Sequence, residues 1–335
     1  MPRTHAPSRP VSVKELAQDL APEITGLPRL SCTVERFLAD ASRDTARAED
    51  FAAALDLDPV LRGWVLRQAN SGFAKLSRPV TSVAQACVVI GVAPLSRLVY
   101  AACTRDLLRR PLVCYRYPGQ GFWLHGLAVC AAAGSLAEQA GPGARLVPEE
   151  ARVAGLIHDV GKLLLDGRLP RTGAPRPVAL AEERALLGAD HGLVSAAVAM
   201  HWQLPAPVVD AVAGHHDPEP SPLGRCIAIA DRLVRHWGLG VWTYARLDLD
   251  PPWRELLDTA APLGLARPAL ENWCAGLPPI LAGLEEMVRA IGHGEPPALP
   301  PAQPDAAPAA VEDRSRRSRR PSRQRESARR RRRRR

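Results

Sequence analysis

The sequence predicts an all-α fold. Apolar residues recur at three- and four-residue spacing through most of the chain, and short proline, glycine and serine clusters separate the segments that carry them. No alternation of apolar and polar residues continues long enough to predict a strand. Only 4% of the 335 residues are aromatic, so alanine, leucine and valine must fill the core. Small side chains of this kind predict helices that pack close together.

The predicted helices begin near the N-terminus. Ser12 and Ser82 each precede a helical pattern, and serine is a favoured N-cap because its hydroxyl accepts a hydrogen bond from the first turn. Pro59, after Asp58, suits a first turn, where its missing N–H costs nothing. Helical spacing covers SVKELAQDLA, TVERFLADASRD, AEDFAAALDLDPVLRGWVLRQAN, SVAQACVVIGVAPLSRLVYAACTRDLL and WLHGLAVCAAAGSLAEQA.

Two later regions show the same spacing. Residues 94–110 combine an apolar stripe with arginines, a pattern that fits either a structural helix with a solvated basic face or a docking surface for a partner. After residue 237 two further segments are expected to pack against the preceding helices without contributing chemistry. The residues that carry these patterns are Arg97, Arg105, Arg109 and Arg110 in the first region, then Trp253, Leu256 and Leu257, and finally Leu281, Leu284, Met287, Val288 and Ile291.

The cysteines and the apolar runs predict a cytoplasmic protein. The N-terminus has no apolar stretch typical of a signal peptide, and the longest near-apolar run, residues 126–137, is too short to span a bilayer, so no transmembrane segment is expected. No C-x-x-C pair is present, which favours buried reduced thiols over disulfides or zinc ligands. The cysteines are Cys32, Cys87, Cys103, Cys114, Cys130, Cys226 and Cys274.

The positive charge is concentrated at the C-terminus. Residues 312–335 hold fourteen arginines and three acidic residues, a net charge of +11, so the other residues carry −2 of the total +9. Such a run, after a Pro/Ala-rich linker, predicts a disordered tail. The tail would bind nucleic acid or an anionic surface in a salt-dependent, non-specific way.

The stretch GLIHDVGKLLL, residues 155–165, places three polar residues inside an apolar run. His158, Asp159 and Lys162 would be costly to bury unless they are paired, hydrogen-bonded or bound to metal. The rest of the chain must therefore supply partners for them.

Several ordered motifs resemble the HDOD domain, a signal-output relative of the HD-domain metal phosphohydrolases. The resemblance covers residues 24–237 and implies a two-lobed helical bundle. The motifs are LPRLS, LDPVLRGWVLRQANS, VTSVAQA and VIG in the first half, then FWLHGLAVC, GLIHDVGK, HGLVSAAVAMHW, AVAGHHDPE and CIAIADRL in the second.

The resemblance, the helical spacing and the composition together imply a division of the chain into five parts. They predict an N-terminal extension, an N-terminal helical lobe, an HD-like helical lobe, additional C-terminal helices, and a disordered Pro/Ala linker with the arginine-rich tail. In that order the parts are residues 1–22, 23–118, 119–237, 238–294 and 295–335.

The resemblance also implies a ligand set for one or two divalent ions such as Mn, Fe, Ni or Zn, which imidazole and carboxylate groups suit. If the site were active, Asp159 would tune a bound water and Lys162 would meet a phosphate; taken alone, Lys162 is expected to be solvated. The alternative to metal binding is a retained hydrogen-bond network that specifies the core. The implied ligands are His125, His158, Asp159, His191, His215 or His216, and Asp231, whereas His5, His201, His236 and His293 match no ligand position.

Two departures weaken the case for catalysis. The HD-GYP phosphodiesterases, which hydrolyse cyclic dinucleotides, carry a glutamate one turn before the first histidine, where this chain has Gly121, and their glycine-tyrosine-proline segment is absent. The resemblance therefore implies a bacterial-type signal-transduction module, without catalysis, that binds a signalling partner, a metal or a nucleotide. The first alternative is a metal-dependent phosphohydrolase of the phosphodiesterase type. The second is a nucleic-acid-associated regulator that acts through its arginine-rich tail.

Overall fold

The structure, a computed structural model, describes residues 12–27, 52, 59–70, 79–90, 92–171, 177–240 and 253–292. These ranges contain helices and no strand, with one isolated antiparallel bridge between Leu112 and Tyr117, which confirms the all-α prediction. Within them, no helix has the length and apolar character needed to cross a membrane.

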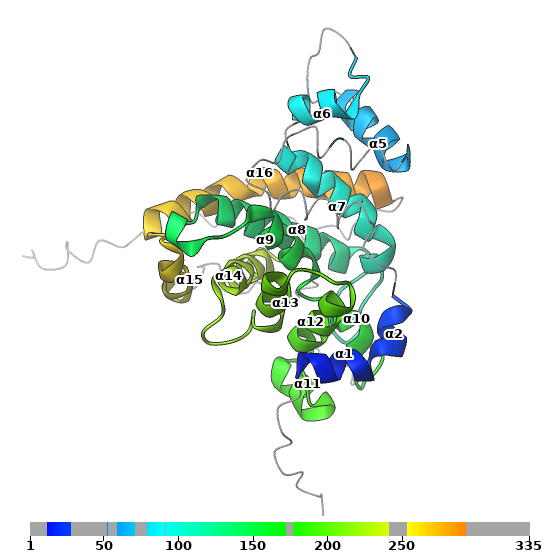
Figure 1. Cartoon of the computed structure of the whole chain (residues 1–335), viewed down its shortest axis with the longest axis vertical. Helices are drawn as coiled ribbons and strands as arrows, with labels where there is room; N and C mark the ends of the chain where they lie inside the picture. Colours follow the sequence, from blue (N-terminus) through cyan, green and yellow to red (C-terminus); the bar gives the residue numbers. More distant parts are fainter. Residues whose placement is uncertain are drawn as a thin grey trace, which may run out of the picture. The chain divides into compact units, whose positions relative to one another are not determined.

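Helices α1 to α16 follow one another as Figure 1 labels them, with two short 3-10 helices, η1 and η2. Their bounds are α1 Val13–Asp19, α2 Ala21–Thr25, α5 Pro59–Asn70, α6 Val83–Ile90, α7 Val92–Leu108, α8 Gly121–Gln139, η1 Pro142–Ala144, α9 Pro148–Ile157, α10 Lys162–Leu165, α11 Leu180–Leu187, α12 His191–His201, α13 Ala206–Ala213, α14 Pro222–His236, α15 Trp253–Ala260, η2 Ala261–Leu263 and α16 Arg267–Gly292.

The helix starts follow the local sequence signals. Ser12 caps α1 in a capping box with Glu15, the Ser82 hydroxyl accepts a hydrogen bond from the Gln85 amide at 3.2 Å, and Pro59 opens α5. The helical pattern over residues 83–108 corresponds to helices α6 and α7, and residue 91 between them lies outside the described residues. The pattern over residues 33–44 lies outside the described residues.

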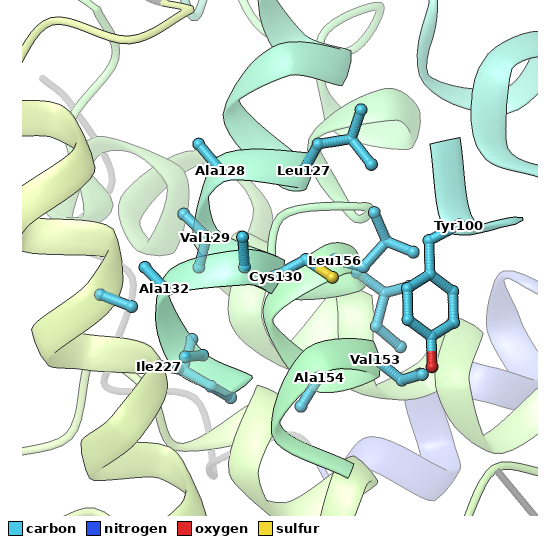
Figure 2. Packing of buried hydrophobic residues seen from close by; sticks show 14 of the residues in the cluster. Tyr100, Leu127, Ala128, Val129, Cys130, Ala132, Val153, Ala154, Leu156 and Ile227 are labelled. Carbon is cyan, nitrogen blue, oxygen red and sulfur yellow. The ribbon is translucent and has the colours of Figure 1, made fainter. Parts of the chain in front are cut away.

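Helix α8 is the centre of the core. It packs against α7, α9, α14 and α16, and nearly all of its side chains are buried. Figure 2 shows α8 beside α9, with the Cys130 side chain near Leu156. A side chain on Gly155 would lie 2.9 Å from the Val129 carbonyl oxygen, so only glycine permits this approach. The small residues of the sequence thus give the close helix packing that they predict.

The remaining elements cover this core. Helix α1 packs on α12, α15 on α14, and α16 on α8 and α7, which agrees with the expected packing of the C-terminal helices. Leu281, Leu284 and Val288 of α16 are buried. Residues 241–252 and 293–335, including the arginine-rich tail, lie outside the described residues.

The cysteines agree with the expectation of reduced thiols. Cys103 is half-buried and forms no disulfide with the described residues. The buried cysteines that likewise form no disulfide there are Cys114, Cys130, Cys226 and Cys274, whereas Cys32 and the Cys87 side chain lie outside the described part.

Candidate metal centre

The polar stretch that interrupts the apolar run forms a tight turn between α9 and α10. His158 directly follows α9, and Gly161 directly precedes α10. The Gly161 amide donates to the Ser195 hydroxyl at 2.8 Å, and a Cβ at Gly161 would lie 2.5 Å from the His191 carbonyl oxygen. A side chain at position 161 would collide with this oxygen, so glycine allows the turn to lie directly on the start of α12. This contact brings His158 and Asp159 beside His191.

The fold gathers all the implied ligands into one cluster. They come from α8, the α9–α10 turn, the start of α12, the turn after α13, and α14, and all are buried except His216, which is half-buried. Three overlapping groups of ligand atoms lie within 4.8 Å of one another, a spacing that could hold a metal ion. They are His191, His215 and His216; His125, His158 and Asp231; and His158, Asp159 and His215.

Two of the histidines are oriented by backbone carbonyls. The Nδ1 atom of His158 lies 2.7 Å from the Gly155 carbonyl oxygen, and that of His215 lies 2.7 Å from the Val212 carbonyl oxygen. In the neutral form of each ring, Nδ1 donates its proton there and Nε2 carries a free lone pair. Neither Nε2 has a hydrogen-bond partner among the described residues. Buried nitrogens in this state are suited to binding a metal ion.

His191 is oriented by a carboxylate. Its Nδ1 lies 3.0 and 2.9 Å from the two carboxylate oxygens of Glu183, a fully buried residue of α11. Its Nε2 lies 2.9 Å from His216 Nε2 and 3.1 Å from Asp159 Oδ1. A carboxylate on the far nitrogen fixes the tautomer and raises the basicity of the ligand nitrogen. Sequence reasoning missed Glu183, because a glutamate eight residues before a histidine resembles an exposed helix residue.

The two aspartates sit among these imidazoles. Asp231 Oδ1 lies 3.1 Å from His125 Nε2 and accepts a hydrogen bond from Arg235 Nε at 2.8 Å. Asp159 Oδ2 lies 2.5 Å from Lys162 Nζ. Arg235, one turn after Asp231, is a second residue that sequence reasoning did not identify; its spacing from Asp231 was the available signal.

The expectation that Lys162 is solvated was wrong. Its side chain is buried, and its ammonium lies 5.3 Å from the ring centre of Tyr115 and 5.5 Å from that of Tyr117. The bridge between Leu112 and Tyr117 folds this tyrosine segment back over the turn that precedes α10. The tyrosines and Asp159 therefore replace water around the ammonium.

The protonation states suit metal binding at neutral pH. Burial lowers the pKa of His215 to about 3 and also lowers the pKa of His125. Burial alone would raise the pKa of Asp159, but His158, Lys162 and His191 outweigh that effect and hold it well below its ordinary value. Burial therefore favours neutral imidazoles at His125 and His215, and the neighbouring groups favour an ionised Asp159.

Backbone occupies the place of the missing glutamate. A Cβ at Gly121 would lie 2.2 Å from the Gly240 carbonyl oxygen, and a Cβ at Gly240 would lie 2.9 Å from the Cβ of His125. Gly240 also has a positive φ of 79°, which favours glycine. The turn after α14 thus lies against the start of α8, and no larger residue than glycine fits at position 121.

Comparison with known proteins gives the same fold. The HDOD domain model matches residues 27–218. A putative signal transduction protein from Marinobacter aquaeolei VT8 superposes with a TM-score of 0.64 at 20% identity, covering 85% of this chain and 67% of that one. An HDOD domain protein of unknown function from Geobacter sulfurreducens gives 0.59 at 23% identity, covering 81% and 97%. A putative phosphohydrolase from Shewanella amazonensis SB2B gives 0.53 at 22% identity, covering 82% and 97%.

One curated relative also matches. It is an uncharacterized protein of Treponema pallidum (strain Nichols), 21% identical over 240 residues. The match covers 66% of this chain and 44% of that protein, so the chain corresponds to less than half of its relative. At these identities the solved structures show a shared fold.

Proposed function

The chain belongs to the HDOD domain family, whose model covers more than half of it, and from this we propose that it is a regulatory module that binds a divalent metal ion without hydrolysing phosphoesters. The observation that carries the proposal is the pair of Nε2 atoms of His158 and His215, which have no hydrogen-bond partner among the described residues and lie inside a largely buried cluster.

The residues present fit such an ion. Neutral imidazole nitrogens and ionised carboxylate oxygens are ligands that Mn, Fe, Ni and Zn accept. The buried atoms that have no hydrogen-bond partner among the described residues include several that a metal would bind, namely Asp159 Oδ1 and the Nε2 atoms of His125, His158 and His215. The residues that would hold the ion are His125, His158, Asp159, His191, His215, His216 and Asp231.

The burial of the cluster argues against turnover. Catalytic metal sites keep an open position for water or substrate, whereas structural sites are closed by protein ligands. Here His125 and His158 are fully buried, and Asp159 is 2% exposed. The Gly240 backbone covers the start of α8 as well. A metal bound here would supply cross-links between helices rather than a reactive water.

Regulation would follow from this cross-linking. The ligands come from separate elements, α8, α12, α14 and the turns after α9 and α13, so binding stabilises one arrangement of them over others. The signal would be the concentration of available metal. The response would be a change in the surface that these helices present to a signalling partner. We include in this proposal that the chain binds a signalling partner and that a nucleotide is an alternative ligand.

One observation favours the first alternative, a metal-dependent phosphohydrolase. Lys162 lies 2.5 Å from Asp159, and in an active site these two groups would act together, the aspartate on a metal-bound water and the lysine on a phosphate. The burial of Lys162 leaves no route for a phosphate ester to reach it without movement of the tyrosine segment.

The second alternative rests on the fourteen arginines near the C-terminus. Truncation after Ala310 would remove them. If the chain is a nucleic-acid-associated regulator, this truncation abolishes RNA or DNA binding, and the full chain loses affinity steeply as salt rises. Nucleic-acid affinity that survives truncation would instead point to the helical domain.

Thermal unfolding and a hydrolysis assay test the proposal together. We expect Mn²⁺, Fe²⁺, Ni²⁺ or Zn²⁺ to raise the Tm of the full chain relative to the chelated protein, and the His158→Ala/Asp159→Ala variant to lose this response. Cyclic dinucleotides and bis-p-nitrophenyl phosphate should remain uncleaved. Metal-dependent cleavage that Asp159→Ala abolishes would establish the phosphohydrolase instead.

A further inference from the structure

A buried row of polar side chains outside the metal cluster joins three helices. The Tyr100 hydroxyl of α7 donates to Glu149 Oε2 at 2.7 Å, and Arg152 Nη1 donates to Glu149 Oε1 at 2.5 Å. Glu149 and Arg152 both belong to α9, and Arg152 Nη2 also contacts Glu138 of α8. Tyr100 is fully buried, Arg152 is 4% exposed and Glu149 is 7% exposed. These four residues, called here the polar row, connect the half-exposed Glu138 with the interior side of α7.

Helix α8 leaves room for the arginine of this row. A Cβ at Gly134 would lie 2.4 Å from Arg152 Cγ and 2.7 Å from Arg152 Nε. Glycine is a poor helix former, and an isolated glycine inside a helix usually has a packing reason. The reason at position 134 is that the Arg152 side chain lies directly against the α8 backbone there. The sequence of α8 is therefore adapted to the row.

The polar row is suited to fixing an orientation. No buried nitrogen or oxygen of the Tyr100, Glu149 and Arg152 side chains lacks a hydrogen-bond partner. A buried ion pair adds little net stability compared with well-packed apolar side chains of similar volume. Hydrogen bonds are directional, however, whereas apolar packing is not. The row therefore restricts how α7 lies relative to α9 in a way that apolar side chains would not.

Helix α7 lies between two groups of helices. It packs on α5 and α6, and it also packs on α8 and α16. Tyr100 of α7 belongs to the buried cluster that Figure 2 shows around α8 and α9. Helix α8 carries His125, and His158 directly follows α9. A displacement of α9 would therefore act on α7 through the bond between Glu149 and Tyr100.

From these contacts we infer that Tyr100 is a positioning residue that couples α7, and with it α5 and α6, to the α8–α9 pair. A change in α8 and α9 reaches α7 through the hydrogen bond of Tyr100 to Glu149, which Arg152 holds in place. The inference does not depend on metal binding. It adds to the proposed function the contact through which a response would leave the region of the cluster.

Hydrogen exchange measured by mass spectrometry on the full chain, without added metal, tests this coupling. Ile227→Val is the perturbation, because Ile227 is fully buried in α14 and α14 packs on α8 and α9. The loss of one buried methylene should speed the exchange of α8 amides about two- to tenfold. With Tyr100 present, we expect the α7 amides to speed up by the same factor, because α7 then opens together with α8 and α9.

Tyr100→Phe removes only the hydroxyl that reaches Glu149. Exchange in α7 should become about tenfold faster or more, because a hydrogen bond to an ion-paired carboxylate is lost. Addition of Ile227→Val should then speed exchange in α8 and leave α7 unchanged. Thr104→Val is the matched control: the Thr104 hydroxyl is also fully buried in α7, but it donates to the Tyr100 carbonyl oxygen at 2.6 Å, within the same helix. This control should keep the response of α7 to Ile227→Val.

Three results would overturn the inference. If Ile227→Val leaves α7 unchanged when Tyr100 is present, the two groups of helices are not coupled. If α7 still responds in Tyr100→Phe, the coupling takes another route, and if Thr104→Val also loses the response, any lost hydrogen bond of α7 has this effect.

The double variant Glu149→Leu/Arg152→Leu removes the acceptor and its ion pair together. It should lose the response of α7 as Tyr100→Phe does, and it replaces that variant if Tyr100→Phe does not fold, as checked by circular dichroism. A response that persists in this double variant would also overturn the inference. Failure of the chain to bind metal would overturn the proposed function and leave this coupling intact.

Discussion

The ammonium nitrogen of Lys162 lies 2.5 Å from Oδ2 of Asp159, and both side chains are buried. Each group therefore depends on the other, because removal of one partner leaves an uncompensated charge in the interior. The pair joins a residue that the family resemblance connects with metal to a cation that the protein itself provides.

Loss of this lysine should destabilise the metal-free protein. Breaking a buried ion pair by removing one partner costs about 3–5 kcal/mol, so we expect Lys162→Met to lower the free energy of unfolding by that amount in urea titrations with chelator. The double variant Lys162→Met/Asp159→Ala should lose less than the sum of the single variants. Additive effects in this cycle would show that the two groups do not interact.

Glu183 should control metal affinity without being a ligand. Its carboxylate contacts His191 Nδ1 and fixes the ring, and mutation of such a partner lowers metal affinity by about 10–100-fold. We expect Glu183→Gln to show this loss in a competition titration with a chromogenic chelator. Glu255→Gln removes a carboxylate that is 67% exposed and should leave the affinity unchanged. Equal metal affinities for the wild type, Glu183→Gln and Glu255→Gln would show that Glu183 does not influence the metal site.

Acid should destabilise the metal-free protein through its buried histidines. Burial holds the pKa of His215 at about 3, below the value of about 6.5 for an unfolded chain. Between these values the unfolded state binds a proton that the folded state does not, so stability falls as the pH falls. The slope is about 1.4 kcal/mol per pH unit for each such histidine.

Urea unfolding at pH 7.5, 6.5 and 5.5 checks this slope. His215→Gln should show a shallower pH dependence than the wild type, whereas His201→Gln, at the half-buried end of α12, should keep the wild-type slope. If His215→Gln instead keeps the full slope, His215 does not remain neutral in the folded protein.

Gly121 should not tolerate a side chain. Its Cβ would lie 2.2 Å from a backbone oxygen of the turn after α14, so Gly121→Ala is expected to cost about 3 kcal/mol or more of unfolding free energy. Gly276→Ala is the control, because nothing lies within 4 Å of a Cβ there and alanine is the better helix former by about 1 kcal/mol. A stable Gly121→Glu variant that binds an additional metal ion would show that the turn moves aside and that the chain retains a route to a catalytic type of site.

The sequence predicts the helical architecture for a physical reason, because amphipathic spacing and caps such as Ser12 act locally. The candidate ligand set follows instead from the order of histidines and aspartates that resembles the family. Partners that depend on tertiary proximity are not recognisable in this way. Glu183 meets His191 only because α11 lies beside the start of α12, and Lys162 is buried only because the Tyr115–Tyr117 segment folds over it.

The metal content of the full chain tests the central claim most directly. The wild type and Asp159→Ala would be purified without chelator, reconstituted with Mn²⁺ or Fe²⁺, and measured by elemental analysis. Asp159 lies beside His125, His158 and His191 in the middle of the cluster, so its removal should abolish metal binding. Metal in the wild type that is lost in Asp159→Ala is the predicted result. A wild-type chain without metal, or equal metal in both proteins, would contradict the account.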